Sequence, residues 1–395
     1  MQRQNNVYRV QGALRLNGKL KRHQLKQGLK KLVEQHAILR TTFHRRPGLK
    51  WPIQMVSPPG SFGSFGWTEQ DWCHKTSAEQ QQQLDRLMHS KQPSSDTAEL
   101  RDPQPPLQVQ LIQRAPDRFW LLFSLPALCA DTTTLSLLVN ALINHYGDDD
   151  ISPRIAVAEV DNEIEPVQYV QISEWQHELL TTEDEDYWAG QAYWNRPALM
   201  QSQSTAQSTA WPLEHRHTAD EAFNPAIFEL DLSQDLRQSI NCFSQSVDIS
   251  MSHILLAGWQ SLISRLTSAQ SLVGVAFDGR DDEELCSALG PLTTYLPIRP
   301  LSSFTQTGTH RSFQQATEQV SHRAEVAASW QQYFTRDRWS AETTSTYFPV
   351  SFNYTDWSLP RSTQQLTVSL ERIVACTERF HLNLSCYRQG DTLTC

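Results

Sequence analysis

The sequence predicts an α/β protein built from two lobes of similar design. Strand and helix patterns are mixed along the whole chain, which is typical of layered α/β folds. The second half, from Phe228 onward, repeats the order of strand and leucine-rich helix with which the chain opens. The length of 395 residues also suits two lobes better than one core. We therefore expect an N-terminal lobe over residues 1–165 and a C-terminal lobe over residues 166–395.

The N-terminal half begins with a strand and a helix. Residues 8–16 alternate apolar and polar side chains and run into Asn17-Gly18, which is a turn signal. Leucines then recur on one face over residues 20–33 and predict a helix, which gives way to a strand within 34–43. Further strands are expected at Trp51–Val56, Leu107–Gln113 and Phe119–Leu125, and further helices at Ala78–Ser90, 135–143, Tyr169–Leu180 and Glu183–Trp194.

A low-complexity stretch separates this half from the next. Residues 201–210 contain only Gln, Ser, Thr and Ala, so we expect a mobile loop over about 201–215. Beyond it, strands are expected at Phe228–Leu232, Ser271–Phe277, Phe348–Tyr354 and Leu382–Tyr387, and helices at Asp235–Ser244 and Ser250–Leu266.

The composition argues against several classes of protein. The net charge is −9, and binding to phosphate backbones needs a basic face, so nucleic-acid binding is not expected. No apolar run approaches the ~20 residues that span a bilayer. The seven cysteines form no CxxC pair and their number is odd, so we expect thiols in a reducing cytoplasm rather than a disulfide scaffold. The spacing of Cys376, His381 and Cys386 matches no common zinc site, and no metal is expected.

Five segments of the chain, taken together and in order, resemble the motifs of one family. The segments are His36–Phe43, Pro126–Thr132, Val167–Gln176, Gly279-Arg280 with Leu289–Arg299, and Phe352–Tyr354. They resemble the RHExLRTxF, HHxxxDG, YxDFAVWQ, GR…IGxFVNTLPLR and F-N-Y/F motifs of the condensation domains of nonribosomal peptide synthetases. The first motif of that family, SxAQxRxW, is missing, so we expect the chain to begin inside the domain.

The resemblance implies both an architecture and partners. The architecture is two chloramphenicol-acetyltransferase-like lobes in a V-shaped pseudo-dimer with a central tunnel. Carrier domains would dock at the two mouths, each presenting a thioester on its phosphopantetheine arm, and the domain itself would bind no cofactor. An adenylation domain would be a neighbour in the same synthetase. Cys129, Tyr295 and Asn353 are candidates to line the tunnel, and Tyr295 would narrow it because the family has a small polar residue there.

The catalytic motif departs from the family at its two histidines. In the family, the second histidine of HHxxxDG assists attack of the amine on the thioester, and the aspartate pairs with the arginine of LPLR. The two histidines correspond to Pro126 and Ala127, the aspartate to Asp131 and the arginine to Arg299. An imidazole in this role contributes ~10²–10⁴-fold to the rate, and alanine has no group that can replace it. We therefore assign no catalytic residue and expect Asp131 and Arg299 to form a structural pair.

Three other side chains are candidates for a replacement catalyst. Cys129 has no evident base or cationic neighbour that would lower the pKa of its thiol, so a buried structural cysteine is the favoured interpretation. His36 at the end of a predicted helix is better explained by packing. His253 lies on an apolar helix and could point inward, but nothing in the sequence gives it a substrate.

Three functions follow from these observations. The first is a catalytically inactive condensation-like domain that docks a carrier domain or recruits a tailoring oxygenase or hydroxylase acting in trans. The second is an active condensation domain of atypical mechanism that forms an amide or ester bond between carrier-bound substrates by positioning alone. The third is a stand-alone acyltransferase with a diffusible acceptor, but such enzymes also need the histidine of an HxxxD core. Pro126 and Ala127 favour the first function.

Overall fold

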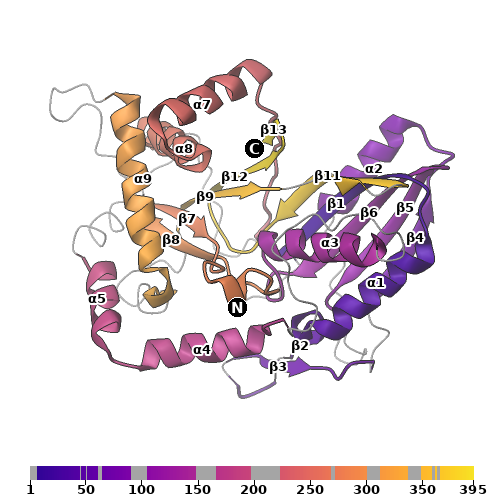
Figure 1. Cartoon of the computed structure of the whole chain (residues 1–395), viewed down its shortest axis with the longest axis horizontal. Coiled ribbons are helices and arrows are strands. Elements are labelled where there is room, and N and C mark those ends of the chain that lie inside the picture. The colour runs from indigo at the N-terminus through magenta and orange to yellow at the C-terminus, as the bar shows by residue number, and fades with distance from the viewer. Residues whose placement is uncertain are drawn as a thin grey trace. The chain divides into compact units, whose positions relative to one another are not determined.

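The computed structural model divides into two compact units (Figure 1). Unit 1 comprises residues 1–173, 280–292 and 358–377, and unit 2 comprises residues 174–279, 293–357 and 378–395. The units are thus interleaved along the sequence. The structure describes residues 7–44, 46–49, 51–60, 65–89, 105–147, 166–196, 223–267, 272–299, 312–336, 348–357, 361–362 and 365–395. The predicted mobile loop at 201–215 lies outside the described residues.

Unit 1 is built on a six-stranded sheet of order β10-β11-β1-β6-β5-β4. Its strands are β1 (Arg9–Gly18), β4 (Gly66–Asp71), β5 (Gln108–Ala115), β6 (Arg118–Pro126), β10 (Arg361–Ser362) and β11 (Leu366–Ala375). Only β4 and β5 pair in parallel; the other neighbours are antiparallel. A separate two-stranded sheet joins β2 (Thr41–His44) to β3 (Ile53–Val56).

Helices cover both faces of this sheet. On one face α1 (Arg22–Gln35) lies beside α3 (Thr132–Gly147), and Leu135 of α3 packs against Gly12 of β1 (Figure 1). Successive residues of a strand face opposite sides, so Ala13 faces the other layer. There α2 (Ser77–His89) contributes Leu84 and Met88 to an apolar cluster with Trp120. The single-turn helix η1 (Ala37–Arg40) connects α1 to β2.

Unit 2 contains a five-stranded sheet of order β13-β12-β9-β7-β8. Its strands are β7 (Val273–Phe277), β8 (Thr294–Ile298), β9 (Val350–Asp356), β12 (Leu382–Gln389) and β13 (Thr392–Thr394). The pairs β12–β9 and β9–β7 are parallel, and the two outer pairs are antiparallel. The core of the unit includes the buried side chains of Val350 and Phe352 from the central strand β9.

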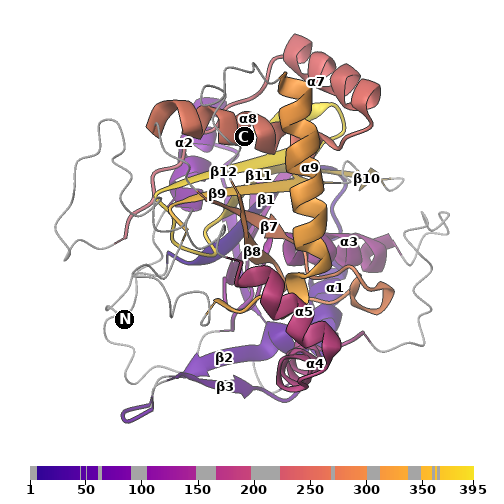
Figure 2. The same ribbon diagram turned by 90° about the vertical axis from the view of Figure 1, so that its left-hand side faces the viewer.

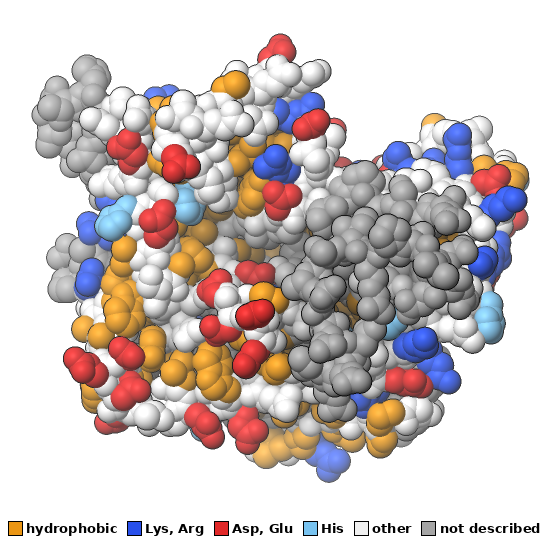
Figure 3. Space-filling model, viewed as in Figure 1, with side chains coloured by type: hydrophobic (Ala, Val, Ile, Leu, Met, Phe, Trp, Pro, Cys, Tyr) orange, Lys and Arg blue, Asp and Glu red, His pale blue; other side chains and the backbone are white. Residues whose placement is uncertain are grey.

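Among the described residues, the helices that lie wholly in unit 2 are α5 (Glu185–Trp194), α7 (Gln234–Val247), α8 (Met251–Thr267), α9 (Phe313–Ser329) and the single turn η3 (Gln331–Tyr333). Figure 2 shows α8 and α9 next to each other beside the sheet, and both contact its strands. Where α5 meets the end of α9, the aromatic rings of Tyr193, Trp194 and Trp330 pack together, and hydrophobic side chains gather over this region in Figure 3. The helix α4 (Tyr169–Thr181) begins in unit 1 and ends in unit 2.

Most predicted elements are present with ends shifted by a few residues. The expected strand over 228–232 is wrong, because its backbone forms only an isolated bridge between Asp231 and Thr394. The helix α9 and the strands β4, β8, β10, β11 and β13 were not predicted from the sequence. Within the described ranges, no helix is both long and apolar enough to cross a bilayer.

Candidate functional site

The candidate site lies where β6 passes through a short loop into α3, in unit 1. At the end of β6, Pro126 is paired with Arg9 of β1, and the next amide, that of Ala127, donates to the Tyr8 carbonyl at 3.0 Å. The amide of Cys129 then donates to the Pro126 carbonyl at 2.9 Å, which turns the chain. Asp131 directly precedes the helix, and its Oδ1 accepts from the Thr134 amide at 2.7 Å. An aspartate at this position caps the helix, so its side chain is held by local structure.

The same carboxylate forms a buried salt bridge with Arg280. Nη1 of Arg280 lies 3.0 Å from Oδ2 of Asp131, and Nη2 lies 3.2 Å from Oδ1. The side chains are only 3% and 4% exposed, so this bidentate pair is shielded from water. The predicted pairing of Asp131 with Arg299 is therefore corrected: the arginine that pairs with the buried carboxylate is Arg280.

Arg299 has a different environment in unit 2. It directly follows β8 and its side chain is exposed. Its backbone carbonyl accepts from Gln260 Nε2 at 3.4 Å and from Arg323 Nη1 at 3.0 Å. The motif segment contains two arginines, and the correspondence with LPLR pointed to Arg299 as the partner of Asp131. The Gly279-Arg280 dipeptide marked the arginine that does pair with Asp131, but the motif alone assigned no partner to Arg280.

Further hydrogen bonds complete the network around Asp131. The Leu292 amide donates to Oδ2 at 2.9 Å. The Thr134 hydroxyl lies 2.7 Å from Asp131 Oδ1 and 2.7 Å from the Gly290 carbonyl, and it accepts from the Gly290 amide at 3.1 Å. Arg280 also donates through Nε to the Ala288 carbonyl at 2.8 Å and through Nη2 to the Gly290 carbonyl at 2.8 Å. Both carboxylate oxygens therefore serve as acceptors in a structural network.

The charge state of Asp131 follows from this network. Complete burial would raise the pKa of the carboxyl, but the positive charge and hydrogen bonds of Arg280, with those of Thr134, more than offset it, and the pKa is lowered. Asp131 is therefore ionised at neutral pH and has no proton to give. Such a group is suited to holding structure in place and not to general acid catalysis.

Apolar packing positions the segment that carries Arg280. Leu285 in the single turn η2 (Glu283–Leu285), Ala288 and Leu292 form a buried cluster with Ile172 of α4. Gly290 has φ +148°, and a Cβ atom there would lie 2.4 Å from Cδ2 of Tyr169. Glycine is thus required where the segment passes Tyr169. Tyr169 belongs to the segment that resembles YxDFAVWQ, so this contact brings that segment against the one that carries Arg280.

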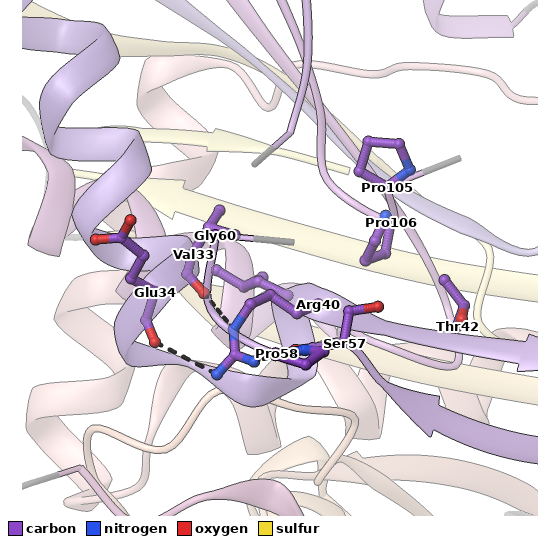
Figure 4. A pocket seen from close by; sticks show the side chains of 10 residues that line it. Val33, Glu34, Arg40, Thr42, Ser57, Pro58, Gly60, Pro105 and Pro106 are labelled. Atoms are coloured by element: carbon purple, nitrogen blue, oxygen red, sulfur yellow. Dashed lines mark hydrogen bonds between the residues drawn. The ribbon is translucent and has the colours of Figure 1, made fainter. Parts of the chain in front are cut away.

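A second set of contacts links the first and third motifs. The Gln168 side chain accepts from the Ala37 amide at 2.8 Å and donates to the Gln35 carbonyl at 3.1 Å. Arg40 donates to the Val33 carbonyl at 2.9 Å and the Glu34 carbonyl at 3.4 Å, and so caps the end of α1 (Figure 4). The side chains of Gln168 and Arg40 thus form these hydrogen bonds with backbone atoms. The small, mostly apolar pocket beside Arg40 is lined by Val33, Glu34, Leu39, Arg40, Thr42, Ser57, Pro58, Gly60, Pro105 and Pro106.

The loop between Pro126 and Asp131 offers no evident base. Ala127 is half-buried and carries only a methyl group, and Cys129 is fully buried, with its Sγ 3.6 Å from the Thr41 carbonyl. Burial raises the pKa of Cys129 to about 12, although the nearby Arg9 favours the thiolate. Arg9 is itself buried and donates through Nε to Ser124 Oγ at 2.7 Å. Sequence patterns gave no signal for Arg9 beyond its place in a strand.

The two histidines considered as replacement bases are both kept neutral by burial, which lowers their pKa values. Burial, and to a smaller extent His145, lower the pKa of His36 to about 4. His253 of unit 2 has its Nδ1 at 2.9 Å from Ser321 Oγ, and Ser321 donates to Glu325 Oε1 at 2.7 Å. This order places the serine hydroxyl between imidazole and carboxylate. A nucleophilic serine requires the imidazole in the middle, so the three groups do not form a catalytic triad.

The remaining predicted residues belong to unit 2. Tyr295 of β8 is 7% exposed, and its ring lies 4.8 Å from that of Phe380. Asn353 of β9 is half-buried and stands opposite Ser385 of β12. A role for Cys129, Tyr295 and Asn353 in lining a tunnel stays a prediction. Among the described residues, no group of three or more His, Cys, Asp or Glu side chains is arranged to hold a metal ion.

Comparison with known proteins identifies the family. The family model described as Condensation domain matches residues 1–395. Tyrocidine synthase 2 of Brevibacillus parabrevis is 24% identical over 327 residues, which are 82% of this chain and 8% of that protein. The chain thus spans a small part of this curated relative.

Solved structures agree with this match. SgcC5 from Streptomyces globisporus superposes with a TM-score of 0.73 at 17% identity, covering 98% of this chain and 86% of that one. The first condensation domain of the calcium-dependent antibiotic synthetase, in complex with substrate analogue 2a, gives a TM-score of 0.73 at 15% identity and covers 99% and 85%.

These likenesses define an α/β fold of the chloramphenicol-acetyltransferase-like kind, as predicted. The chain belongs to the condensation domain family, in the form found in nonribosomal peptide synthetases. The membership in that family that the five segments predicted is thereby confirmed.

Proposed function

We propose that this condensation domain does not itself carry out condensation and instead serves as a docking platform in a nonribosomal peptide synthetase. The observation that carries the proposal is the combination of Pro126 and Ala127 with an intact network around Asp131. The loop keeps the contacts that shape it and lacks the imidazole that would act on a substrate. A platform for protein partners needs the first property and not the second.

The chemistry of amine attack on a thioester supports this assignment. As the amine adds to the carbonyl carbon, a proton must leave the nitrogen or the charged intermediate must be stabilised. The methyl group of Ala127 offers neither a lone pair nor a hydrogen-bond donor. Asp131 is ionised but already accepts from Arg280, Thr134 and Leu292. Cys129 is fully buried, and the high pKa of its thiol keeps it protonated at neutral pH.

The partners follow from the family. A carrier domain presents its substrate on a phosphopantetheine arm, and the platform would bind the carrier or bring a tailoring oxygenase or hydroxylase to it in trans. An adenylation domain of the same synthetase would be a neighbour. The arm would belong to the carrier and not to this chain.

A condensation assay tests the proposal. Donor and acceptor carriers, both loaded with aminoacyl thioesters, are mixed with the chain, and the dipeptidyl product is followed by mass spectrometry while carrier binding is measured by titration. We expect carrier binding without a product above the uncatalysed background. The variant Ala127→His, which restores one imidazole, is the matched comparison, and a gain of up to ~10²–10⁴-fold would show that the site lacks only its base.

One result of this assay would refute the proposed docking role. If the unmodified chain makes product at a rate that Ala127→His does not increase, the domain is a condensation catalyst that works by positioning alone. The platform assignment would then be wrong, whatever partners the domain binds.

A further inference from the structure

Two cysteine sulfur atoms meet at one end of the sheet of unit 2. Cys386 lies on β12 and is fully buried, while Cys395 directly follows β13 and is half-buried. Their Sγ atoms are 2.7 Å apart. A disulfide bond has a sulfur–sulfur distance of about 2.05 Å, so the two thiols need to approach by only about 0.7 Å to become bonded.

The fold fixes this approach. The strands β12 and β13 form a tight hairpin whose two turn residues are Gly390 and Asp391, and Gly390 has φ +55°, as such turns require. Tyr387 is paired with Thr394, and extending the register by one residue places Cys386 opposite Cys395. Opposed residues of antiparallel strands have Cα atoms about 4.5–5.5 Å apart, within the range that disulfides bridge. The sulfur contact is therefore set by the backbone register.

A second set of contacts holds Cys395 from the other side. Its amide donates to the Leu230 carbonyl at 2.9 Å, and its carbonyl accepts from the Leu230 amide at 2.8 Å. The Thr394 hydroxyl donates to Asp231 at 2.6 Å. Cys395 thus lies between β12 and the backbone at residues 230–232, so a bond to Cys386 would fasten this part of unit 2 covalently.

We propose that Cys386 and Cys395 form a thiol-oxidation site in which hydrogen peroxide or a related hydroperoxide converts the pair to an intramolecular disulfide. Cys395 is the accessible member and reacts first, while the buried Cys386 resolves. The sulfur–sulfur hydrogen bond lowers the pKa of Cys395, and the same bond together with burial raises that of Cys386. This asymmetry fits the order of reaction.

The chemistry balances in two steps. The Cys395 thiolate attacks one oxygen of the peroxide, the O–O bond breaks, and the departing hydroxide takes up a proton, which leaves a sulfenic acid and one water. The Cys386 sulfur then attacks the Cys395 sulfur, the S–O bond breaks, and the hydroxide leaves with the Cys386 proton as a second water. The thiols lose two electrons and the peroxide gains them. A dithiol reductant reverses the bond by thiol–disulfide exchange.

Peptide mapping tests this inference directly. The reduced chain is exposed to hydrogen peroxide and then unfolded in urea with iodoacetamide, which alkylates the remaining thiols including the buried ones, and the protein is digested with trypsin. Cleavage after Arg379 and Arg388 places Cys386 in the peptide 380–388 and Cys395 in the peptide that begins at Gln389. We expect these two peptides to be joined, two hydrogens lighter than their sum, with loss of alkylation at both cysteines. Dithiothreitol restores both.

The controls separate this site from general oxidation. Cys242→Ser removes an exposed thiol on α7 and leaves the cross-link unchanged, whereas Cys395→Ser abolishes it and leaves Cys386 alkylatable only after unfolding. Oxidation in concentrated urea, which removes the register, spreads the pairing among the seven cysteines. The inference is overturned if the folded chain retains alkylatable Cys395 after peroxide treatment, or if Cys395 is found joined to any cysteine other than Cys386.

Discussion

The Asp131–Arg280 pair gives the sharpest test of how unit 1 is held together. The perturbation is Arg280→Ala. It removes the hydrogen bonds that the guanidinium donates to Asp131, Thr134 and the carbonyls of Ala288 and Gly290, and it leaves the Asp131 carboxylate buried without its cation. The matched control is Arg299→Ala, because Arg299 is the arginine of the same motif segment but its side chain is exposed.

The magnitude follows from burial. Removing one partner of a buried ion pair costs about 3–5 kcal/mol, because the remaining charge is desolvated without compensation. The two side chains are 3% and 4% exposed, so this range applies in full. An exposed substitution such as Arg299→Ala stays within about 0.5 kcal/mol of the parent. With a denaturant slope of about 2–3 kcal/mol per molar urea, Arg280→Ala lowers the unfolding midpoint by roughly 1–2.5 M.

Equilibrium unfolding in urea at pH 7, followed by tryptophan fluorescence and far-ultraviolet circular dichroism, measures this difference. A double variant tests whether the unpaired charge of Asp131 is what destabilises the Arg280→Ala protein. Asn at position 131 still caps α3 but has no charge, so Arg280→Ala with Asp131→Asn should be more stable than Arg280→Ala alone. The reasoning is refuted if Arg280→Ala is as mild as Arg299→Ala, or if removing the carboxylate charge makes the Arg280→Ala protein less stable.

Three further predictions concern stability. Burial lowers the pKa of His36 to about 4 in the folded chain, so the folded state is stabilised when this imidazole is neutral. That stabilisation is fully present above the unfolded pKa of about 6.5 and is lost as the pH falls toward 4. The loss is about 3 kcal/mol, and melting temperatures between pH 7.5 and 4 should fall less steeply for His36→Gln. Gly290→Ala forces a methyl group against Tyr169 at positive φ and should cost about 1–3 kcal/mol in urea unfolding. Gly60→Ala, where φ is also positive but the added methyl group meets no neighbour within 4 Å, is its comparison for the effect of φ alone. Ser312→Ala removes the capping box with Gln315 and should cost about 1 kcal/mol, measured as faster amide exchange in the first turn of α9.

Strongly periodic segments were predictable from the sequence, and segments defined by distant contacts were not. The apolar run of β6 and the leucine spacing of α3 were enough to predict the strand–loop–helix join. The helix α9 was missed because its sequence, from Phe313 to Ser329, is polar on most of its surface and depends on packing against α8. Tertiary contacts of this kind outweigh local propensity.

The candidate site shows the same limit. Asp131 and the missing imidazoles were identified by motif position, but the partner of Asp131 was not. Local sequence does not distinguish Arg280 from Arg299, since both follow a strand in one motif segment. What distinguishes them is the buried cluster of Leu285, Ala288 and Leu292, which anchors the segment carrying Arg280. The sequence likewise did not predict roles in the site for Thr134, Tyr169 and Gly290, because these roles depend on contacts of that segment with α3 and α4.

The interleaving of the units also governs how the chain can mature during synthesis. Asp131 leaves the ribosome 149 residues before the arginine that neutralises it. Until residues 280–292 have been made, α3 has a cap but no cation, and β1 lacks β11 as its neighbour until residues 366–375 have been made as well. The first unit therefore completes its fold only after most of the second has been translated. A gene fragment ending at residue 173 would encode an unfinished protein, so recombination in this region should exchange both units together.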